Sequence, residues 1–229
     1  MKILIIRPQP GNDASAKRAR EAGFEPLQLP FFEVRPHRWE APDATHFDAL
    51  LITSANVVRH AGAGLAAYAH LPVHAVGRNS ADAAKDAGLT LASAGTKGVD
   101  EVLQAAQATG HQRLLWLAGE DRTAFTPPDD VSIDLRIVYT AEAVELTSEA
   151  RAIIASADIV ALHSARAARI FAEFVDTRDL PRADIRLAAF SQAIAEAAGK
   201  GWQAIAVAAR PEDEALLSAA RALGKQTSK

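Results

Sequence analysis

Small hydroxyl and guanidinium side chains follow several short apolar runs of this 229-residue chain. Thr53 and Ser54 close the run that begins at Ala49, and Ser164 follows the run Ile159–His163. Hydroxyls at helix starts, exposed backbone N–H groups and guanidinium forks all favour carboxylate or phosphate groups. The pattern predicts binding of an anionic ligand, and the candidate binding residues are Arg7, Thr53, Ser54, Ser80, Arg122, Ser164 and Ser191.

Each of these residues also has an ordinary structural explanation. Serine and threonine are the usual caps of helix N-termini, and a lone arginine is by default a solvated surface charge. The binding prediction therefore depends on the whole set lying at the carboxyl ends of strands, where open α/β sheets bind their ligands.

Other chemistries are excluded by residue type or spacing. The string Gly62–Ala67 fits a dinucleotide fingerprint, but it lies inside an expected helix, far past its strand. There is no P-loop and no nucleophile elbow. His163 and Ser164 do not form a triad, because adjacent strand residues face opposite ways and no acid is placed to orient the imidazole.

Metal and thiol chemistry are also not expected. The chain has no cysteine, and Pro72 interrupts the helix that would align His70 with His74. No cofactor and no metal are predicted.

Short apolar runs alternate with alanine-rich helical patterns along the whole chain. Most runs are continuously apolar, which is typical of parallel strands covered on both faces by helices. The sequence therefore predicts an α/β fold with doubly wound parallel sheets. The expected strands are Lys2–Arg7, Phe24–Leu29, Ala49–Thr53, Val73–Val76, Leu89–Ala92, Arg113–Leu117, Leu135–Tyr139, Ile159–His163, Arg186–Phe190 and Ala204–Ala208.

Two parts of the chain repeat each other. Asp48 and Ser54 recur as Asp158 and Ser164 (158 − 48 = 110; 164 − 54 = 110), and Gly88 recurs as Gly199 (199 − 88 = 111). Ordered matches at nearly one offset predict two domains of similar architecture.

The repeat also predicts where the domains begin and end. The second copy lacks two strands after its last unit, and the N-terminal segment supplies two. We therefore expect a discontinuous domain of residues 1–30 and 147–229, with residues 39–139 inserted. Segments 31–38 and 139–146 then cross between the domains as a two-stranded hinge, and the candidate sites face each other across one cleft.

Composition argues against a nucleic-acid-binding, an exported and a membrane-spanning protein. Apolar residues make up 49% of the chain, charged residues 23%, and the formal net charge is −3 without a Lys/Arg cluster, so no nucleic-acid partner is expected. The apolar start Ile3–Ile6 is too short for a signal peptide, and no run is long enough to span a membrane. A cytoplasmic protein is expected.

The order of the motifs resembles the uroporphyrinogen-III synthase family over essentially the whole chain. Arg7-Pro8 follows the first strand, Thr53-Ser54-Ala55-Asn56 matches the family's Thr-Ser-Ala-Asn, and Tyr139 lies where the family has a tyrosine. Val76-Gly77 before Ser80-Ala81 and the closing stretch through Pro211 also fit. Ile6 and His163 depart from the family pattern, as do the acidic residues before Arg122.

The resemblance implies two flavodoxin-like domains and a cofactor-free lyase. Its substrate is hydroxymethylbilane, a linear tetrapyrrole that is closed with inversion of ring D. It also implies Tyr139 as the catalytic donor that helps hydroxide leave, although an aromatic filler at the hinge is the structural alternative. A monomer is expected.

Two other functions stay open. The chain is alternatively a non-catalytic two-domain binder of a small polyanion, or a diverged paralogue that keeps the fold without the activity.

Overall fold

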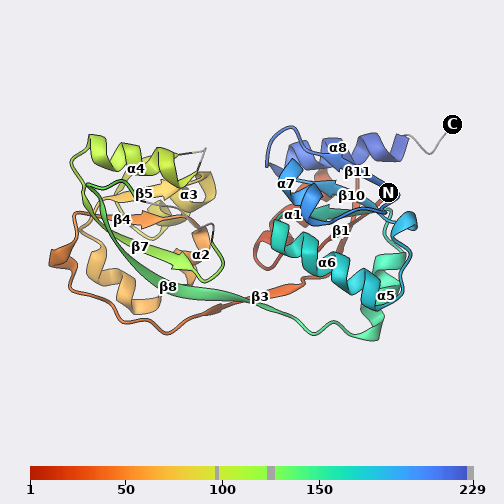
Figure 1. Cartoon of the computed structure of the whole chain (residues 1–229), viewed down its shortest axis with the longest axis horizontal. Helices are drawn as coiled ribbons and strands as arrows, with labels where there is room; N and C mark the ends of the chain where they lie inside the picture. Colours follow the sequence, from red (N-terminus) through yellow and green to blue (C-terminus); the bar gives the residue numbers. More distant parts are fainter. Residues whose placement is uncertain (96–97, 123–126, 226–229) are drawn as a thin grey trace. The chain divides into compact units, whose positions relative to one another are not determined.

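The computed structural model describes residues 1–95, 98–122 and 127–225, and these divide into two compact units (Figure 1). Unit 1 comprises residues 1–33 and 143–229, and unit 2 comprises residues 34–142. Each unit contains one sheet with helices packed on it. The prediction of an α/β fold with parallel sheets is confirmed.

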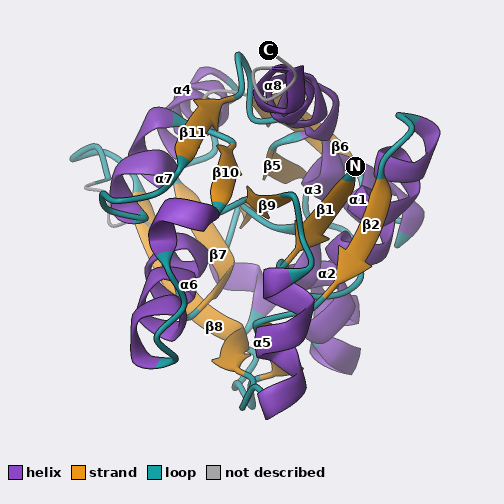
Figure 2. Ribbon diagram, turned by 90° about the vertical axis from the view of Figure 1, so that its right-hand side faces the viewer, coloured by secondary structure: helices purple, strands orange, loops and turns teal. Residues whose placement is uncertain are grey.

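Unit 1 contains a five-stranded sheet in the order β11-β10-β9-β1-β2, and the strands are parallel throughout (Figure 2). Its strands are β1 (Lys2–Ile5), β2 (Glu25–Gln28), β9 (Ile159–Leu162), β10 (Arg186–Ala189) and β11 (Ala204–Val207). Its helices are α1 (Gly11–Glu21), α5 (Ser148–Ala155), α6 (Ala165–Thr177), the short η3 (Arg182–Asp184), α7 (Gln192–Ala197) and α8 (Asp213–Lys225).

Unit 2 contains a sheet in the order β3-β8-β7-β4-β5-β6. Its strands are β3 (Phe32–Pro36), which begins in unit 1, β4 (Ala49–Ile52), β5 (Val73–Val76), β6 (Leu91–Gly95), β7 (Arg113–Gly119) and β8 (Ser132–Ala143). Its helices are η1 (Ala44–His46), α2 (Ala55–His60), η2 (Gly62–Tyr68), α3 (Arg78–Asp86) and α4 (Val99–Ala108).

The central strand β4 shows why the apolar runs are continuous. All four of its residues are fully buried. Leu50 and Ile52 join one hydrophobic cluster, whereas Ala49 and Leu51 join another. Because side chains alternate between the two faces of a strand, both faces of this sheet are covered.

The internal repeat corresponds to an equivalent contact in each unit. Asp48 exchanges hydrogen bonds with the backbone of Arg113 at the start of β7, with N···O distances of 2.8 and 2.9 Å. Asp158 does the same with Lys2 at the start of β1, at 3.0 and 2.6 Å. The residues 110 apart therefore join matching pairs of strands, with β4 and β7 corresponding to β9 and β1.

Glycines end equivalent helices of the two units. Gly88 follows α3 with φ of 78°, and Gly199 follows α7 with φ of 77°. An L side chain rarely adopts this conformation, so glycine is required at both ends.

Several element ends differ from the sequence-based expectations; for example, the strand expected at Leu89–Ala92 lies at Leu91–Gly95. Two elements differ more strongly. The helix expected around Gly62–Ala67 is interrupted, because Gly62 takes φ of 66° and a 3-10 helix follows α2. Strand β8 is longer than expected and runs through to Ala143. It pairs with β3, where hydrogen bonds join the His37 N–H to Val138 and the Val144 N–H to Phe31.

Candidate functional site

Most of the candidate residues of unit 2 lie at the carboxyl ends of three neighbouring strands, β7, β4 and β5. Thr53 and Ser54 follow β4, which lies between β5 and β7. Ser54 caps α2, since its hydroxyl accepts from the Asn56 N–H at 3.2 Å. The Thr53 hydroxyl accepts from Trp116 Nε1 at 3.3 Å. Both hydroxyls thus have structural partners while lying at the edge where α/β sheets bind ligands.

Tyr139 lies at the same edge, on β8 beside the end of β7. Its register partner is Gly119, and its ring covers that residue so closely that a Cβ there would lie 2.7 Å from the Tyr139 hydroxyl. His60, at the end of α2, packs against the ring with 6.2 Å between centroids. Burial, and secondarily the charge of Arg59, lower the pKa of His60.

The other two candidates of unit 2 differ in exposure. Ser80 is the third residue of α3 and is only 4% exposed. Arg122 is exposed, and its Nη1 donates to the Glu120 carbonyl at 3.1 Å. Arg122 is therefore accessible to an anion, whereas the Ser80 side chain is largely covered by protein.

In unit 1, β1, β9 and β10 are neighbours, and each is followed by one candidate. Ser164 caps α6 by accepting from the Ala167 N–H at 3.1 Å, and Ser191 caps α7 by accepting from the Ile194 N–H at 3.4 Å. Arg7 follows β1 with a side chain that is 30% exposed. Eight candidates thus form two sets, five in unit 2 and three in unit 1.

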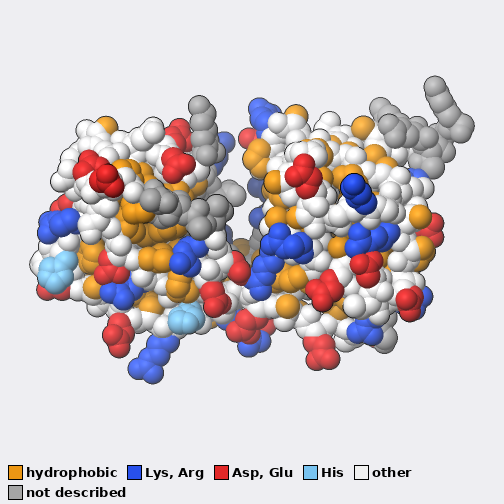
Figure 3. Space-filling model, in the orientation of Figure 1, with side chains coloured by type: hydrophobic (Ala, Val, Ile, Leu, Met, Phe, Trp, Pro, Cys, Tyr) orange, Lys and Arg blue, Asp and Glu red, His pale blue; other side chains and the backbone are white. Residues whose placement is uncertain are grey.

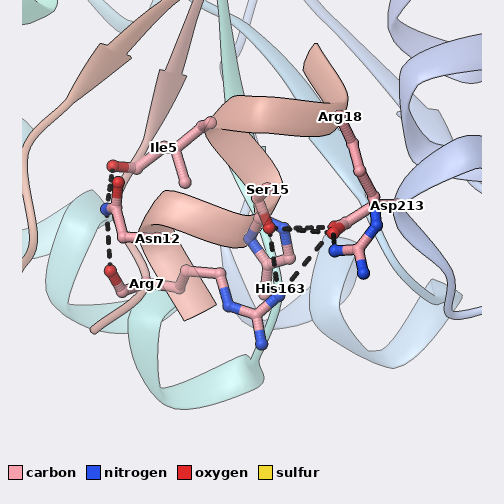
Figure 4. A network of polar contacts seen from close by, with 7 residues as sticks. All are labelled: Ile5, Arg7, Asn12, Ser15, Arg18, His163 and Asp213. Carbon is pink, nitrogen blue, oxygen red and sulfur yellow. Dashed lines mark hydrogen bonds and ion pairs between the residues drawn. The ribbon is translucent and has the colours of Figure 1, made fainter. Parts of the chain in front are cut away.

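A buried carboxylate in unit 1 corrects the sequence analysis. We expected no acid placed to orient His163, but Asp213 Oδ1 lies 3.2 Å from His163 Nε2 (Figure 4). Ser15 Oγ and Arg18 Nη1 donate to the other carboxylate oxygen at 2.9 and 2.8 Å. The expectation failed because 50 residues separate His163 from Asp213, and only the packing of α8 on the sheet brings them together.

The ionisable side chains of this network differ in their charge at pH 7. Burial alone would raise the pKa of Asp213, but the hydrogen bonds from His163 and Ser15, the charge of Arg7 and, when it is protonated, the charge of His163 lower it. Burial lowers the pKa of His163, so the imidazole is neutral at pH 7 and donates from Nε2. The carboxylate is therefore balanced by Arg7 and Arg18 rather than by the histidine.

One sequence signal of this network is present in the N-terminal helix. The buried residues of α1 are Asn12, Ser15, Ala16 and Ala19, which are spaced as one helix face. Two polar residues on a buried face require partners. Given that this face is buried, the spacing of Asn12 and Ser15 on it indicates a polar network under α1.

Within residues 1–95, 98–122 and 127–225, no group of three or more His, Cys, Asp or Glu residues is placed to hold an ion.

A comparison with protein-family models finds one match, to uroporphyrinogen-III synthase HemD, and it spans residues 13–218. The chain belongs to the uroporphyrinogen-III synthase family. The family carries out a cyclising lyase reaction of haem biosynthesis on a tetrapyrrole substrate. The resemblance seen in the sequence is thereby confirmed.

Solved structures of uroporphyrinogen-III synthases have the same fold. The synthetase of Helicobacter pylori is 17% identical, with a TM-score of 0.64 over 97% of this chain and 99% of that one. A mutant synthase of Thermus thermophilus is 17% identical, with a TM-score of 0.53 over 98% and 99%. No curated protein sequence matches the chain.

In the part of the chain that the structure describes, no helix combines the length and apolarity required to cross a bilayer.

Proposed function

We propose that the chain cyclises hydroxymethylbilane with inversion of ring D, giving uroporphyrinogen III and water. The family match over residues 13–218 carries this proposal. The hydroxyls and arginines at the carboxyl ends of the strands support it, because the substrate is a flexible polycarboxylate and such groups bind carboxylates.

The chemistry begins with departure of the substrate hydroxyl. The C–O bond breaks, the hydroxyl leaves as water with one added proton, and an electrophilic azafulvene remains. The substituted carbon of the last ring attacks it and forms a spiro intermediate. Fragmentation and reclosure invert that ring, and loss of a proton restores aromaticity.

The protein contributes mainly the shape of the bound substrate. Hydroxymethylbilane also closes without an enzyme, to the uninverted type I product, so the protein must hold the chain such that the other carbon bonds first. Thr53, Ser54, Ser80 and Arg122 of unit 2 are the binding residues proposed there; Arg7, Ser164 and Ser191 are those of unit 1.

Tyr139 is the proposed catalytic residue. Its ring is held over Gly119 at the strand ends, and its hydroxyl donates to the departing oxygen, which favours water over hydroxide as leaving group. Tyr139 thus acts as a general acid in the loss of the hydroxyl group, a step that the positioning of the substrate already favours.

The proposal also includes the domain organisation, the oligomeric state and the cellular location of the chain. The two units act as flavodoxin-like domains near residues 1–30 with 147–229 and 39–139, and segments 31–38 and 139–146 form the hinge. The equivalent strand orders and the paired Asp48 and Asp158 contacts support similar domains. The chain works as a cytoplasmic monomer and binds no nucleic acid; the face in Figure 3 carries interspersed positive and negative side chains rather than a continuous basic surface.

Separation of the product isomers tests the proposal. The purified chain is mixed with freshly made hydroxymethylbilane, the product is oxidised, and the type I and type III porphyrins are separated by chromatography. A synthase makes mostly type III. A non-catalytic polyanion binder or an inactive paralogue leaves the type I product of the protein-free reaction unchanged.

A further inference from the structure

The first residue of α8 places a carboxylate inside unit 1. The Asp213 side chain is 7% exposed and receives three donors from two parts of the chain: Ser15 and Arg18 on α1, and His163 after β9. A buried carboxylate with several donors is held in one geometry, because losing any donor leaves an unsatisfied charge.

The guanidinium of Arg7 is fixed by the same network. Its Nη1 donates to Ser15 Oγ at 3.1 Å and lies 3.9 Å from Asp213 Oδ1. Ser15 in turn donates to Asp213, so the hydroxyl bridges the cation and the anion. Figure 4 shows the Arg7 tip beside Ser15 and His163.

The backbone of Arg7 is held as well. Asn12 is fully buried, and its Nδ2 donates to the carbonyls of Ile5 and Arg7, each at 2.8 Å. Gly11 then leaves room for the guanidinium, since a Cβ at that position would lie 2.6 Å from Arg7 Nε and 2.9 Å from Nη2. The turn between β1 and α1 is shaped around this side chain.

The network leaves positive charge on its accessible side. Arg7 and Arg18 each carry one positive charge, Asp213 carries one negative charge, and His163 is neutral. Asp213 is nearly covered, whereas Arg7 is 30% exposed. An anion that approaches the carboxyl end of β1 therefore meets the arginine and not the acid.

The cavity beside Asp213 excludes a direct role for the acid in binding. It is lined by Ser15, His163 and Asp213 among apolar side chains and has a volume of about 10 Å³. That is about the space of one water molecule, which is too small for any carboxylate-bearing group. The network acts through Arg7.

We propose that Asp213 and His163, with Ser15, are positioning residues that hold the Arg7 guanidinium over Gly11 so that its remaining donors bind a substrate carboxylate. This rests on the proposed function, in which Arg7 is a binding residue. Asp213 orients the guanidinium group of Arg7. The neutral imidazole of His163 hydrogen-bonds to Oδ1 of Asp213 and leaves the positive charge of Arg7 uncompensated.

Gly11→Ala separates positioning from structural support. Gly11 is the first residue of α1, and the three nearest atoms to a Cβ there all belong to the Arg7 side chain, so the thermal midpoint changes little. The added Cβ displaces the guanidinium, so the KM for hydroxymethylbilane rises about tenfold while kcat changes less than twofold. A KM rise at constant kcat indicates the loss of binding common to ground and transition states.

Asp213→Asn and Arg7→Ala form the second arm. Each single variant raises KM about tenfold, and the double variant raises it no further, because both remove the same interaction. Asp176→Asn is the matched control, since Asp176 pairs with Arg182 at 2.7 Å in the same unit and takes no part in the site. If Asp213→Asn does not fold, Ser15→Ala replaces it, with a KM rise of about threefold.

Two results overturn the proposal, and they are distinguishable. If the wild-type chain yields no excess of the type III isomer, the proposed function fails and this inference fails with it. If the wild type is active but Gly11→Ala and the Asp213 or Ser15 variant leave KM within twofold, the positioning role is wrong and the proposed function stands.

Discussion

The ring of Tyr139 covers the backbone of Gly119, so that the glycine has no space for a side chain. A Cβ at position 119 would lie 2.7 Å from the tyrosine hydroxyl. The two residues are register partners on neighbouring strands, and the ring is therefore held by the sheet itself. The role of Tyr139 can therefore be tested by substituting either Tyr139 or Gly119.

Tyr139→Phe lowers kcat roughly 100-fold, the lower range for the loss of a general acid, and leaves type III as the enzymatic product. The reason is that positioning of the substrate is kept while the proton donor is lost. Steady-state kinetics with isomer analysis measure both quantities. Tyr68→Phe is the matched control: this buried tyrosine donates to the Pro42 carbonyl at 2.6 Å, and its loss lowers stability by about 1 kcal/mol without lowering kcat.

Gly119→Ala is expected to lower kcat in the same direction as Tyr139→Phe. The added methyl group forces the ring to move, because the contact is with the rigid ring and not with a flexible tail. Kinetics of the single and double variants check the coupling. Additive losses would show that Gly119 affects turnover by another route, which would contradict the assigned contact.

Acid destabilises the chain through one buried histidine of unit 2, His74. His74 is fully buried, its Nδ1 lies 2.7 Å from Ser93 Oγ, and its Nε2 lies 2.8 Å from His111 Nδ1. Burial, and then the charge of His111, lower the pKa of His74 to about 4. The unfolded chain binds this proton near pH 6.5 and the folded chain only near 4, so stability falls as the pH drops through that window.

Urea unfolding at pH 7 and pH 5 measures this effect. The free energy of unfolding of the wild type falls by about 2 kcal/mol more than that of His74→Asn over this range. An identical pH dependence in the two proteins would contradict the depressed pKa.

Equivalent aspartates stabilise the two units. Asp48 accepts from the Arg113 backbone and from its side chain, with 2.6 Å to Nη2, and these hydrogen bonds, with burial opposing, lower its pKa to about 2. Asp48→Asn and Asp158→Asn should each cost about 1 kcal/mol of stability after allowance for exposure. Denaturant unfolding measures the loss, and Asp82→Asn, an exposed carboxylate on α3, is the control.

Residues 34–142 form a continuous unit with buried clusters on both faces of its sheet. We therefore expect this segment to fold without the rest of the chain. Circular dichroism and a cooperative thermal transition of the isolated polypeptide check this. A molten, non-cooperative segment would argue against the proposed domain.

The order of strands and helices was predictable because buried parallel strands such as Ala49–Ile52 are continuously apolar and because Gly88 and Gly199 mark helix ends. The offset between Asp48 and Asp158 likewise matches an equivalent contact in the structure. Local patterns suffice for such features, since each one is set by residues near in sequence.

The remaining features depend on packing between distant segments. The partner of His163 lies on α8, where Asp213 stands between Glu212 and Glu214, and the sequence offers no reason to choose it over these two acids. The interruption at Gly62 was missed because a single glycine is compatible with a helix until its φ is known. Which hydroxyls touch substrate stays a prediction, since capping and binding use the same residue types.

The ratio of type III to type I isomer in a single turnover, with the chain in excess over fresh hydroxymethylbilane, tests the central claim most directly. Positioning by the strand-end side chains predicts that nearly all of the product is type III. A ratio equal to that of the protein-free reaction would contradict it.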